Sequence, residues 1–161
     1  MIIQIHVPSQ TLTLHDTHGR LLRRTLVATG KNGVGELNGS EQTPRGWHVI
    51  RAKIGAGLAP GAVLVGRRPT GEVYAPAMRA EFPQRDWILT RILWLSGLEP
   101  GRNRLGRVDT MRRYIYIHGC PDEDAMGIPS SHGCIKMRNS EIIGLYERVP
   151  AGTRVQIIGE D

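Results

Sequence analysis

The chain has 161 residues, of which 40% are apolar and 22% are charged; this composition is typical of a globular protein and unlike that of disordered or collagen-like chains. The length predicts a single domain over residues 1–161, with a core that needs no disulfide or metal support. The net charge of +6 suits an anionic partner. With only three Trp, four Tyr and one Phe, however, the chain offers little base-stacking surface, and we expect no nucleic-acid partner.

The termini and the hydropathy pattern bear on location. No run of about 18 apolar residues occurs, so we expect no membrane span. Residues 1–10 lack the basic region, the apolar stretch and the small-residue cleavage site of an export signal. We therefore expect a cytoplasmic protein whose two cysteines are thiols rather than a secreted disulfide framework.

Short strands are expected through most of the chain. In the first of them, Ile3, Ile5 and Val7 alternate with polar residues at a period of two, which is the strand pattern. The predicted strands are residues 3–7, 11–14, 21–28, 47–53, 62–65, 87–95, 114–118 and 154–158. Residues 30–46 and 97–112 are rich in glycine, asparagine and charge, and we expect surface loops there.

One helix is predicted, over residues 140–149. Ser140 is a suitable N-cap, an apolar face follows at helical spacing, and Pro150 ends the helix. Gly144 weakens the helix by up to about 1 kcal/mol relative to alanine. Many short strands with one helix predict a mainly β fold, either a sandwich or an open barrel.

The residues with catalytic chemistry gather in two short segments, His118-Gly119-Cys120 and Ser131-His132-Gly133-Cys134. A cysteine thiolate, an imidazole and backbone N–H groups exposed by glycine are the groups that an acyl-transfer site needs. Spacing alone does not decide which cysteine attacks. We favour Cys134, which lies in a Ser/Gly-rich turn, and expect Cys120 to be a buried small residue.

A metal site is the alternative chemistry for the same residues. Two His-x-Cys pairs fourteen residues apart could supply a Cys2His2 zinc site. The single residue between histidine and cysteine is unlike the usual spacing of zinc knuckles, so we expect no metal and no other cofactor.

The two segments resemble the conserved motifs of the YkuD-type L,D-transpeptidase catalytic domain. Tyr116-Ile117-His118-Gly119 is followed, sixteen residues after the histidine, by the cysteine of Ser131-His132-Gly133-Cys134-Ile135-Lys136-Met137. The N-terminal half is similar too, through Ala28-Thr29-Gly30 and Thr43-Pro44-Arg45-Gly46-Trp47. The resemblance covers essentially the whole chain.

The resemblance implies a β-sandwich-like fold and a cysteine nucleophile. It implies that Cys134 forms a thioester and that His118, oriented by a carbonyl such as that of Gly119, acts as general base and acid. It further implies an oxyanion hole of backbone N–H groups at Gly133 and Cys134, in a turn that Ser131 and His132 shape.

Two positions depart from the family pattern. Lys136 stands where the family usually has arginine, and lysine lacks the bidentate fork that suits a carboxylate. We expect either that Arg138 takes over substrate anchoring or that position 136 only supports the turn. Cys120 stands where a hydroxyl residue is common, which leaves its role open.

The implied substrate is a murein tetrapeptide, free or sugar-linked, cut between the L-centre of its diamino acid and the terminal D-alanine. Without an export signal, we expect an L,D-carboxypeptidase that serves cytoplasmic peptidoglycan recycling. The alternative within this chemistry is an L,D-transpeptidase that forms 3-3 cross-links in the periplasm. A non-catalytic zinc or nucleic-acid-binding module is the alternative of another class. The resemblance also implies acylation by carbapenem-type β-lactams.

Overall fold

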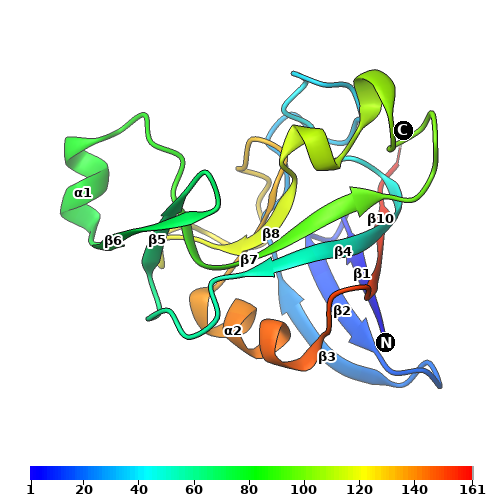
Figure 1. The fold of residues 1–161 in the computed structure, drawn as a ribbon, viewed down its shortest axis with the longest axis horizontal. Helices are drawn as coiled ribbons and strands as arrows, with labels where there is room; N and C mark the ends of the chain where they lie inside the picture. Colours follow the sequence, from blue (N-terminus) through cyan, green and yellow to red (C-terminus); the bar gives the residue numbers. More distant parts are fainter. Residues whose placement is uncertain (161) are drawn as a thin grey trace.

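The computed structural model describes residues 1–160, which form ten strands and two short α-helices (Figure 1). The strands are β1 (Ile2–His6), β2 (Thr11–His15), β3 (Leu21–Leu26), β4 (Gly46–Ile54), β5 (Ala62–Val65), β6 (Arg68–Val73), β7 (Ile88–Gly97), β8 (Tyr116–Gly119), β9 (Ile135–Met137) and β10 (Arg154–Ile158). The helices are α1 (Pro76–Glu81) and α2 (Asn139–Arg148), and two single 3₁₀ turns, Gly106–Val108 and Met111–Arg113, precede β8.

All ten strands belong to one sheet, which curls around its core (Figure 1). Its main path runs in the order β3-β2-β1-β10-β4-β7-β5-β6. Strand β8 pairs antiparallel with β7 and parallel with β9, and β1 pairs parallel with the last strand, β10. The branch β7-β8-β9 is the part of the sheet that carries the two motif segments.

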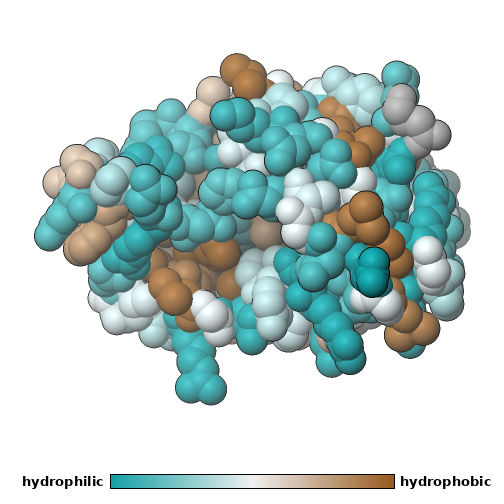
Figure 2. Space-filling view, turned by 90° about the horizontal axis from the view of Figure 1, so that it is seen from above, coloured by the Kyte–Doolittle hydropathy of each residue, from teal (hydrophilic) through white to brown (hydrophobic). Residues whose placement is uncertain are grey.

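The core lies between the curled sheet and helix α2. Ile142, Leu145 and Val149 of the helix face join one apolar cluster with residues of β1, β2, β7, β8, β9 and β10, and the helix packs against β7 and β8. Removing such side chains from water is the main force that holds the layers together. The face of the molecule that Figure 2 shows is largely hydrophilic, with apolar side chains in separate patches.

The predicted mainly β class is confirmed, and the helix after the motif cysteine lies within one residue of its expected bounds. The helix begins at Asn139, however, and Arg138 occupies the N-cap position without a side-chain capping bond, so the N-cap prediction for Ser140 is wrong. A Cβ at position 144 would lie 2.2 Å from Nη1 of Arg23, so the guanidinium that pairs with Glu141 at 3.0 Å would have to shift.

Helix α1 and the strands β6 and β9 are absent from the sequence prediction. Strand β9 has only three residues, which are too few to show a periodic pattern. The helix has six residues, begins at Pro76 and buries none of its side chains completely, so it leaves no periodic apolar pattern in the sequence. Strand β6 is mostly exposed and therefore lacks the alternation that indicates a half-buried strand. Within residues 1–160 no helix combines the length and the apolar character that crossing a bilayer requires.

Candidate active site

His118 lies on β8, in register with Lys136 of the parallel strand β9, and its side chain is almost fully buried. Its Nδ1 is 2.6 Å from the carbonyl oxygen of Gly119. Because a carbonyl only accepts, this bond places the ring proton on Nδ1 and leaves the Nε2 lone pair free. Burial lowers the pKa of His118, against the opposing effect of the Gly119 bond, so the ring is a neutral base at pH 7.

Gly119 is required next to this histidine. A Cβ at position 119 would lie 2.4 Å from Oδ1 of Asn139 and 2.7 Å from the carbonyl oxygen of Leu89, and backbone cannot yield cheaply at that distance. The absence of a side chain therefore lets β8 approach β7 and helix α2 at the point where the His118 ring is fixed.

Cys134 directly precedes β9 and sends its sulfur towards β8. Its Sγ accepts a hydrogen bond from the N–H of Tyr116 at 3.3 Å and donates to the carbonyl of Tyr114 at 3.4 Å. Tyr114 has left-handed backbone angles, φ 55° and ψ 48°, which are uncommon for a side chain of this size. Burial raises the pKa of the Cys134 thiol to about 12, so the resting sulfur carries its proton.

Both side chains open into one cleft of about 520 Å³. The cleft is lined by Gly66, Arg67, Asp86, Ile88, Arg113, Tyr114, Ile115, Tyr116, His118, Ser131, His132 and Cys134. The structure thus brings together the two residues for which the sequence predicts the chemistry. The lining also contains two arginines and one aspartate from other elements, which the sequence did not single out.

Arg113 is the cation that acts on the cysteine. Its guanidinium donates to the carbonyls of Gly35 and Gln42 and to Oγ of Ser40, which are all uncharged acceptors. Burial lowers its pKa, but an arginine stays protonated in proteins. Its positive charge lowers the pKa of the Cys134 thiol, although burial and the carboxylate of Asp86, which both raise this pKa, outweigh its effect.

Arg67 lies at the tip of the hairpin between β5 and β6. Its guanidinium lies 4.7 Å from the ring centre of Trp94 and 4.9 Å from that of Tyr114, and it donates to the hydroxyl of Tyr116 at 3.0 Å. Among residues 1–160 it has no carboxylate partner within ion-pair distance. A fixed guanidinium without a counter-ion at the cleft is suited to bind a carboxylate.

The turn before Cys134 is closed by its own serine and held by the N-terminal half of the chain. Oγ of Ser131 donates to the carbonyl of Cys134 and accepts from the N–H of Gly133 at 3.1 Å. Oγ1 of Thr43 donates to the carbonyl of Gly133 at 2.9 Å and accepts from the N–H of Gly30 at 2.8 Å. Ser131 therefore shapes the turn as expected, and Thr43 fixes it from outside.

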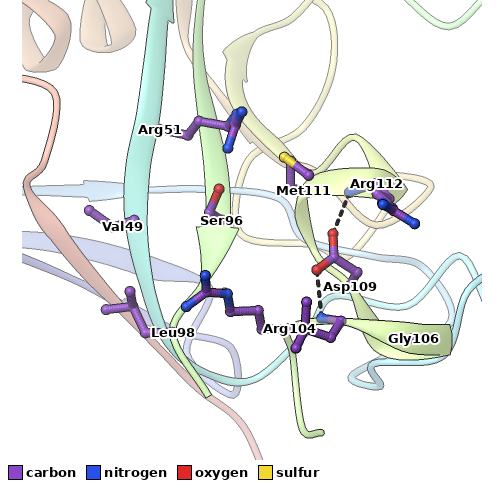
Figure 3. Close-up of a pocket in the computed structure, with 11 residues that line it drawn as sticks. Val49, Arg51, Ser96, Leu98, Arg104, Gly106, Asp109, Met111 and Arg112 are labelled. Carbon is purple, nitrogen blue, oxygen red and sulfur yellow. Dashed lines mark hydrogen bonds between the residues drawn. The ribbon is translucent and has the colours of Figure 1, made fainter. Parts of the chain in front are cut away.

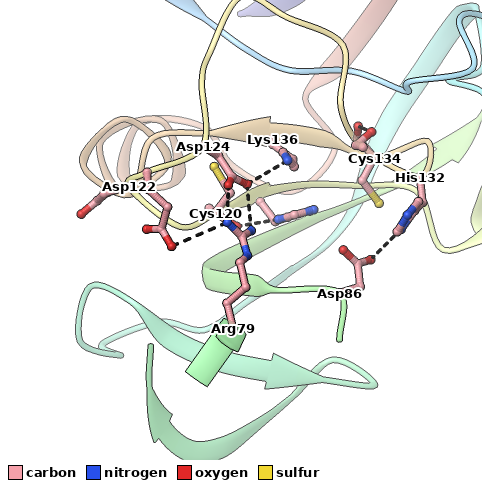
Figure 4. Close-up of polar contacts among 12 residues, drawn as sticks. Arg79, Asp86, Cys120, Asp122, Asp124, His132, Cys134 and Lys136 are labelled. Atoms are coloured by element: carbon pink, nitrogen blue, oxygen red, sulfur yellow. Dashed lines mark hydrogen bonds and ion pairs between the residues drawn. The ribbon is translucent and has the colours of Figure 1, made fainter. Parts of the chain in front are cut away.

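These bonds change the expected oxyanion hole. The N–H of Gly133, at φ +120°, is already bonded to Ser131. The N–H of Cys134 has no hydrogen-bond partner within the described part of the chain and is the donor left in this turn. His132 is exposed at the rim of the cleft and lies 3.9 Å from Oδ2 of Asp86 (Figure 4).

Lys136 and Arg138 do not line the cleft. Nζ of Lys136 pairs with Asp124 at 2.9 Å, and the same carboxylate pairs with Arg79 of α1 at 2.7 Å (Figure 4). Arg138 donates to the carbonyl of Asp122. Of the two expected possibilities, this geometry favours a supporting role for position 136 over substrate anchoring by Arg138, because both cations hold the loop that follows β8.

Cys120 is fully buried and donates its S–H to the carbonyl of Met137 at 3.3 Å. Burial raises the pKa of its thiol to about 11, and it is not part of the cleft lining, in keeping with the expected buried small residue. In the part of the chain that the structure describes, no group of three or more His, Cys, Asp or Glu side chains could hold a metal ion.

Arg67, Asp86 and Arg113 are the lining residues that sequence reasoning missed. The Gly66-Arg67 pair that follows the apolar run 62–65 was a usable signal for a two-residue turn, and both residues have positive φ. Asp86 and Arg113 follow no periodic pattern, and their approach to Cys134 depends on the tertiary fold.

The chain is similar to known proteins in sequence and in fold. The family model described as the L,D-transpeptidase catalytic domain, YkuD, matches residues 1–157. The probable L,D-transpeptidase ErfK/SrfK of Salmonella typhimurium is 30% identical over 128 residues, which are 78% of this chain and 35% of that protein. The chain spans about a third or less of the length of the curated relatives it matches.

The fold is similar to that of solved L,D-transpeptidases. The L,D-transpeptidase from Mycobacterium smegmatis matches with a TM-score of 0.57 and 19% identity, over 98% of this chain and 58% of its own. LD transpeptidase LdtMt1, solved in complex with imipenem, matches with a TM-score of 0.58 and 18% identity, over 98% of this chain and 58% of its own. At these identities the structural likeness concerns the fold alone.

Proposed function

The chain belongs to the YkuD family of L,D-transpeptidase catalytic domains, and from this premise we propose that Cys134 attacks the bond between an L-diamino acid and D-alanine in a peptidoglycan stem tetrapeptide. The observation that carries the proposal is the cleft shared by Cys134 and His118, with the imidazole proton held on Nδ1 by Gly119. The resulting acyl-enzyme is a thioester.

The proposed reaction starts from an uncharged pair. Because the pKa of the thiol is raised and that of the imidazole is lowered, the S–H proton passes to Nε2 of His118 as Sγ bonds to the carbonyl carbon. The protonated His118 then returns this proton to the amine nitrogen of the leaving D-alanine as the C–N bond breaks. Water attacks the thioester with His118 again as the base, and the thiol is regenerated.

Two groups serve the negative charge that develops in this reaction. The free N–H of Cys134 is the proposed donor to the carbonyl oxygen of the tetrahedral intermediate, because the N–H of Gly133 is already bonded. The guanidinium of Arg113, which acts on the sulfur electrostatically, stabilises the thiolate character of the transition state. Preorganised donors of this kind typically contribute about 3–4 kcal/mol each.

Water is the acyl acceptor in our proposal, so the enzyme is an L,D-carboxypeptidase. The cleft presents Arg67 and Arg113 against the single carboxylate of Asp86. This excess of positive charge attracts the carboxylates of a tetrapeptide and disfavours a protonated amine acceptor. The predicted cytoplasmic location stays a proposal, which fractionation of cells producing the tagged full-length protein tests.

Transpeptidation is the second candidate, and one observation favours it. Asp86 is half exposed at the rim of the cleft, 3.9 Å from His132, where its carboxylate is accessible to an ammonium group. An amine bound there would compete with water for the thioester. Asp86→Asn removes this charge without changing the size of the side chain.

Mass spectrometry of one reaction distinguishes the two fates. The protein is incubated with the tetrapeptide, with and without a second stem peptide that offers its side-chain amine. Tripeptide and free D-alanine in both samples support hydrolysis, whereas cross-linked dimers that Asp86→Asn suppresses would establish transpeptidation. Cys134→Ala and His118→Ala should abolish or nearly abolish either product, and Cys120→Ala should have a mild effect.

Carbapenems provide an independent probe of the nucleophile. Since a structural neighbour was solved with imipenem, we propose that imipenem acylates Cys134 of this chain. The intact mass should rise by one drug molecule in the wild type and in Cys120→Ala, but not in Cys134→Ala. Labelling of Cys134→Ala would show that another residue is the nucleophile.

A further inference from the structure

A second pocket, of about 430 Å³, lies outside the catalytic cleft against β4 and β7 (Figure 3). Three arginines, Arg51, Arg104 and Arg112, contribute to its lining. Within the described residues none of the three forms an ion pair or a side-chain hydrogen bond. Val49, Leu98, Leu105 and Met111 supply its apolar walls.

One buried polar atom in this pocket has no partner. The hydroxyl oxygen of Ser96 is inaccessible to solvent and makes no hydrogen bond in the described part of the chain. Figure 3 places Ser96 on β7, between the guanidinium groups of Arg51 and Arg104. A buried hydroxyl without a partner is costly. If the Ser96 side chain turns towards the pocket, a ligand oxygen seated between the two arginines can accept its hydrogen bond.

The backbone aims Arg51 at this pocket. The register of β4 on β7 shifts between Ile50 and Ala52, so Arg51 is the extra residue of a β-bulge. Bulges turn a side chain out of the regular alternation and often occur beside functional sites. The guanidinium of Arg51 lies 5.4 Å from the ring centre of Trp94, which shares a face of β7 with Ser96.

Asp109 is the one carboxylate in the lining, and its charge is already engaged. Its Oδ1 accepts from the N–H of Leu105 at 2.6 Å and its Oδ2 from the N–H of Arg112 at 3.0 Å. With three arginines against one aspartate, the lining keeps a net positive charge. The pocket therefore favours an anion, and oxygen anions match both the guanidinium forks and the free hydroxyl.

Trp94 links this pocket to the catalytic cleft. Its ring contacts the guanidinium of Arg51, which lines the pocket, and that of Arg67, which lines the cleft and lies 4.7 Å from the ring centre. Trp94 also packs in the apolar cluster that includes Tyr116 and Cys134. A substrate that extends beyond the cleft therefore meets the cations of the pocket next.

We infer that this pocket binds an oxyanion, a phosphate or a carboxylate, that the substrate carries beyond the tetrapeptide residues in the cleft. The inference rests on the proposed function for the identity of the substrate. The oxyanion would lie between Arg51 and Arg104 and accept the hydrogen bond of Ser96. The preferred substrate is then an extended, anionic tetrapeptide rather than the free peptide.

The first experiment measures binding and needs no turnover. Inorganic pyrophosphate is titrated into the full chain by calorimetry, using wild type, the double variant Arg51→Gln/Arg104→Gln, and Ser96→Ala. Arg24→Gln is the charge control, because Arg24 is exposed on β3 and away from the pocket. The double variant should lose about tenfold or more in affinity, a loss typical of charge-assisted bonds, while Arg24→Gln should bind like wild type. If the wild type does not bind pyrophosphate, or if the double variant binds it with the same affinity as the wild type, the proposed oxyanion site is wrong.

The second experiment tests whether the substrate carries the anion. KM is compared for two tetrapeptides, one linked to a neutral sugar and one linked to a sugar that bears a diphosphate. The diphosphate should lower KM about fivefold or more in wild type and not in the double variant. Equal KM values would overturn the substrate-borne assignment. Turnover of the neutral-sugar tetrapeptide by the double variant shows separately whether the proposed function holds.

Discussion

Replacing Thr43 by valine isolates the bonds that fix the catalytic turn from outside. Thr43 is fully buried, and valine has nearly its shape but no hydroxyl. In the wild type the Thr43 hydroxyl bonds to the carbonyl of Gly133 at 2.9 Å and to the N–H of Gly30 at 2.8 Å. The valine variant leaves both of these buried groups without a partner. At about 1–3 kcal/mol for each unsatisfied group, the loss is about 2–6 kcal/mol, which is a large part of a typical stability of about 5–15 kcal/mol.

Thr43→Ser is the matched control, because it keeps the hydroxyl and removes only one buried methyl, worth about 0.8 kcal/mol. Urea unfolding under reducing conditions gives the free energy of unfolding for both variants, and tetrapeptide turnover gives kcat. We expect kcat of Thr43→Val to fall as much as about 100-fold, since small displacements of a nucleophile have effects of this size, and that of Thr43→Ser to change little. If the two variants lose equal stability and equal activity, the two hydrogen bonds do not hold the turn.

Three further predictions concern the ionised groups. Because burial lowers the pKa of His118, the base is present above that pKa and is lost as the pH falls through it. The acid limb of kcat/KM should therefore lie below pH 6.5, the ordinary value, and a limb above 6.5 would contradict the neutral pair. In the same turnover assay, Arg113→Met should lower kcat/KM about 100-fold, and Arg113→Lys should lower it less because the charge is kept. If both variants are as active as the wild type, Arg113 has no part in the mechanism. Lys136→Met should destabilise the protein by about 1–3 kcal/mol with KM unchanged, and Lys136→Arg should be mild. Burial raises the pKa of Asp124, but hydrogen bonds from Arg79 and Lys136 lower it more, so the pKa lies below its usual value of 3.8. The Asp124 carboxylate therefore contributes to stability above pH 3.8, and this contribution is lost as the pH falls through the lowered pKa. Urea unfolding at pH 7 and pH 3 measures this loss of stability. A raised KM for Lys136→Met would show instead that Lys136 binds the substrate.

Local sequence pattern predicts most of the strands that have a buried face, but it misses β9, which is largely buried and only three residues long. Residues 62–65 and 154–158 form strands at the predicted bounds, because their apolar side chains are buried in the core. The prediction fails where burial is slight. Strand β6 depends on its hairpin with β5, and helix α1 depends on contacts such as the Arg79–Asp124 ion pair. The spacing of residues in the sequence does not predict such contacts.

The same distinction applies to the site. His118 and Cys134 could be predicted because chemistry and spacing occur within two short segments. For Arg67 the sequence could predict the turn but not its direction towards the cleft, and Arg113 could not be predicted, because the whole fold determines how each reaches the cleft. Lys136 shows that closeness in sequence does not place a side chain in the cleft. It lies two residues after the nucleophile, yet its ammonium group pairs with Asp124 at 2.9 Å, in line with the possibility that this position has a supporting role only.

The position of β10 has a consequence for biosynthesis. This last strand lies between β1 and β4, so the hairpin strands at the start of the chain join the centre of the sheet only after residues 154–158 have left the ribosome. Gly30, which follows those first strands, forms a bridge with Ser131 and bonds to Thr43. A nascent chain that lacks β10 therefore has its cysteine but not the framework around it, and the reactivity of the cysteine should begin only after β10 has joined the sheet.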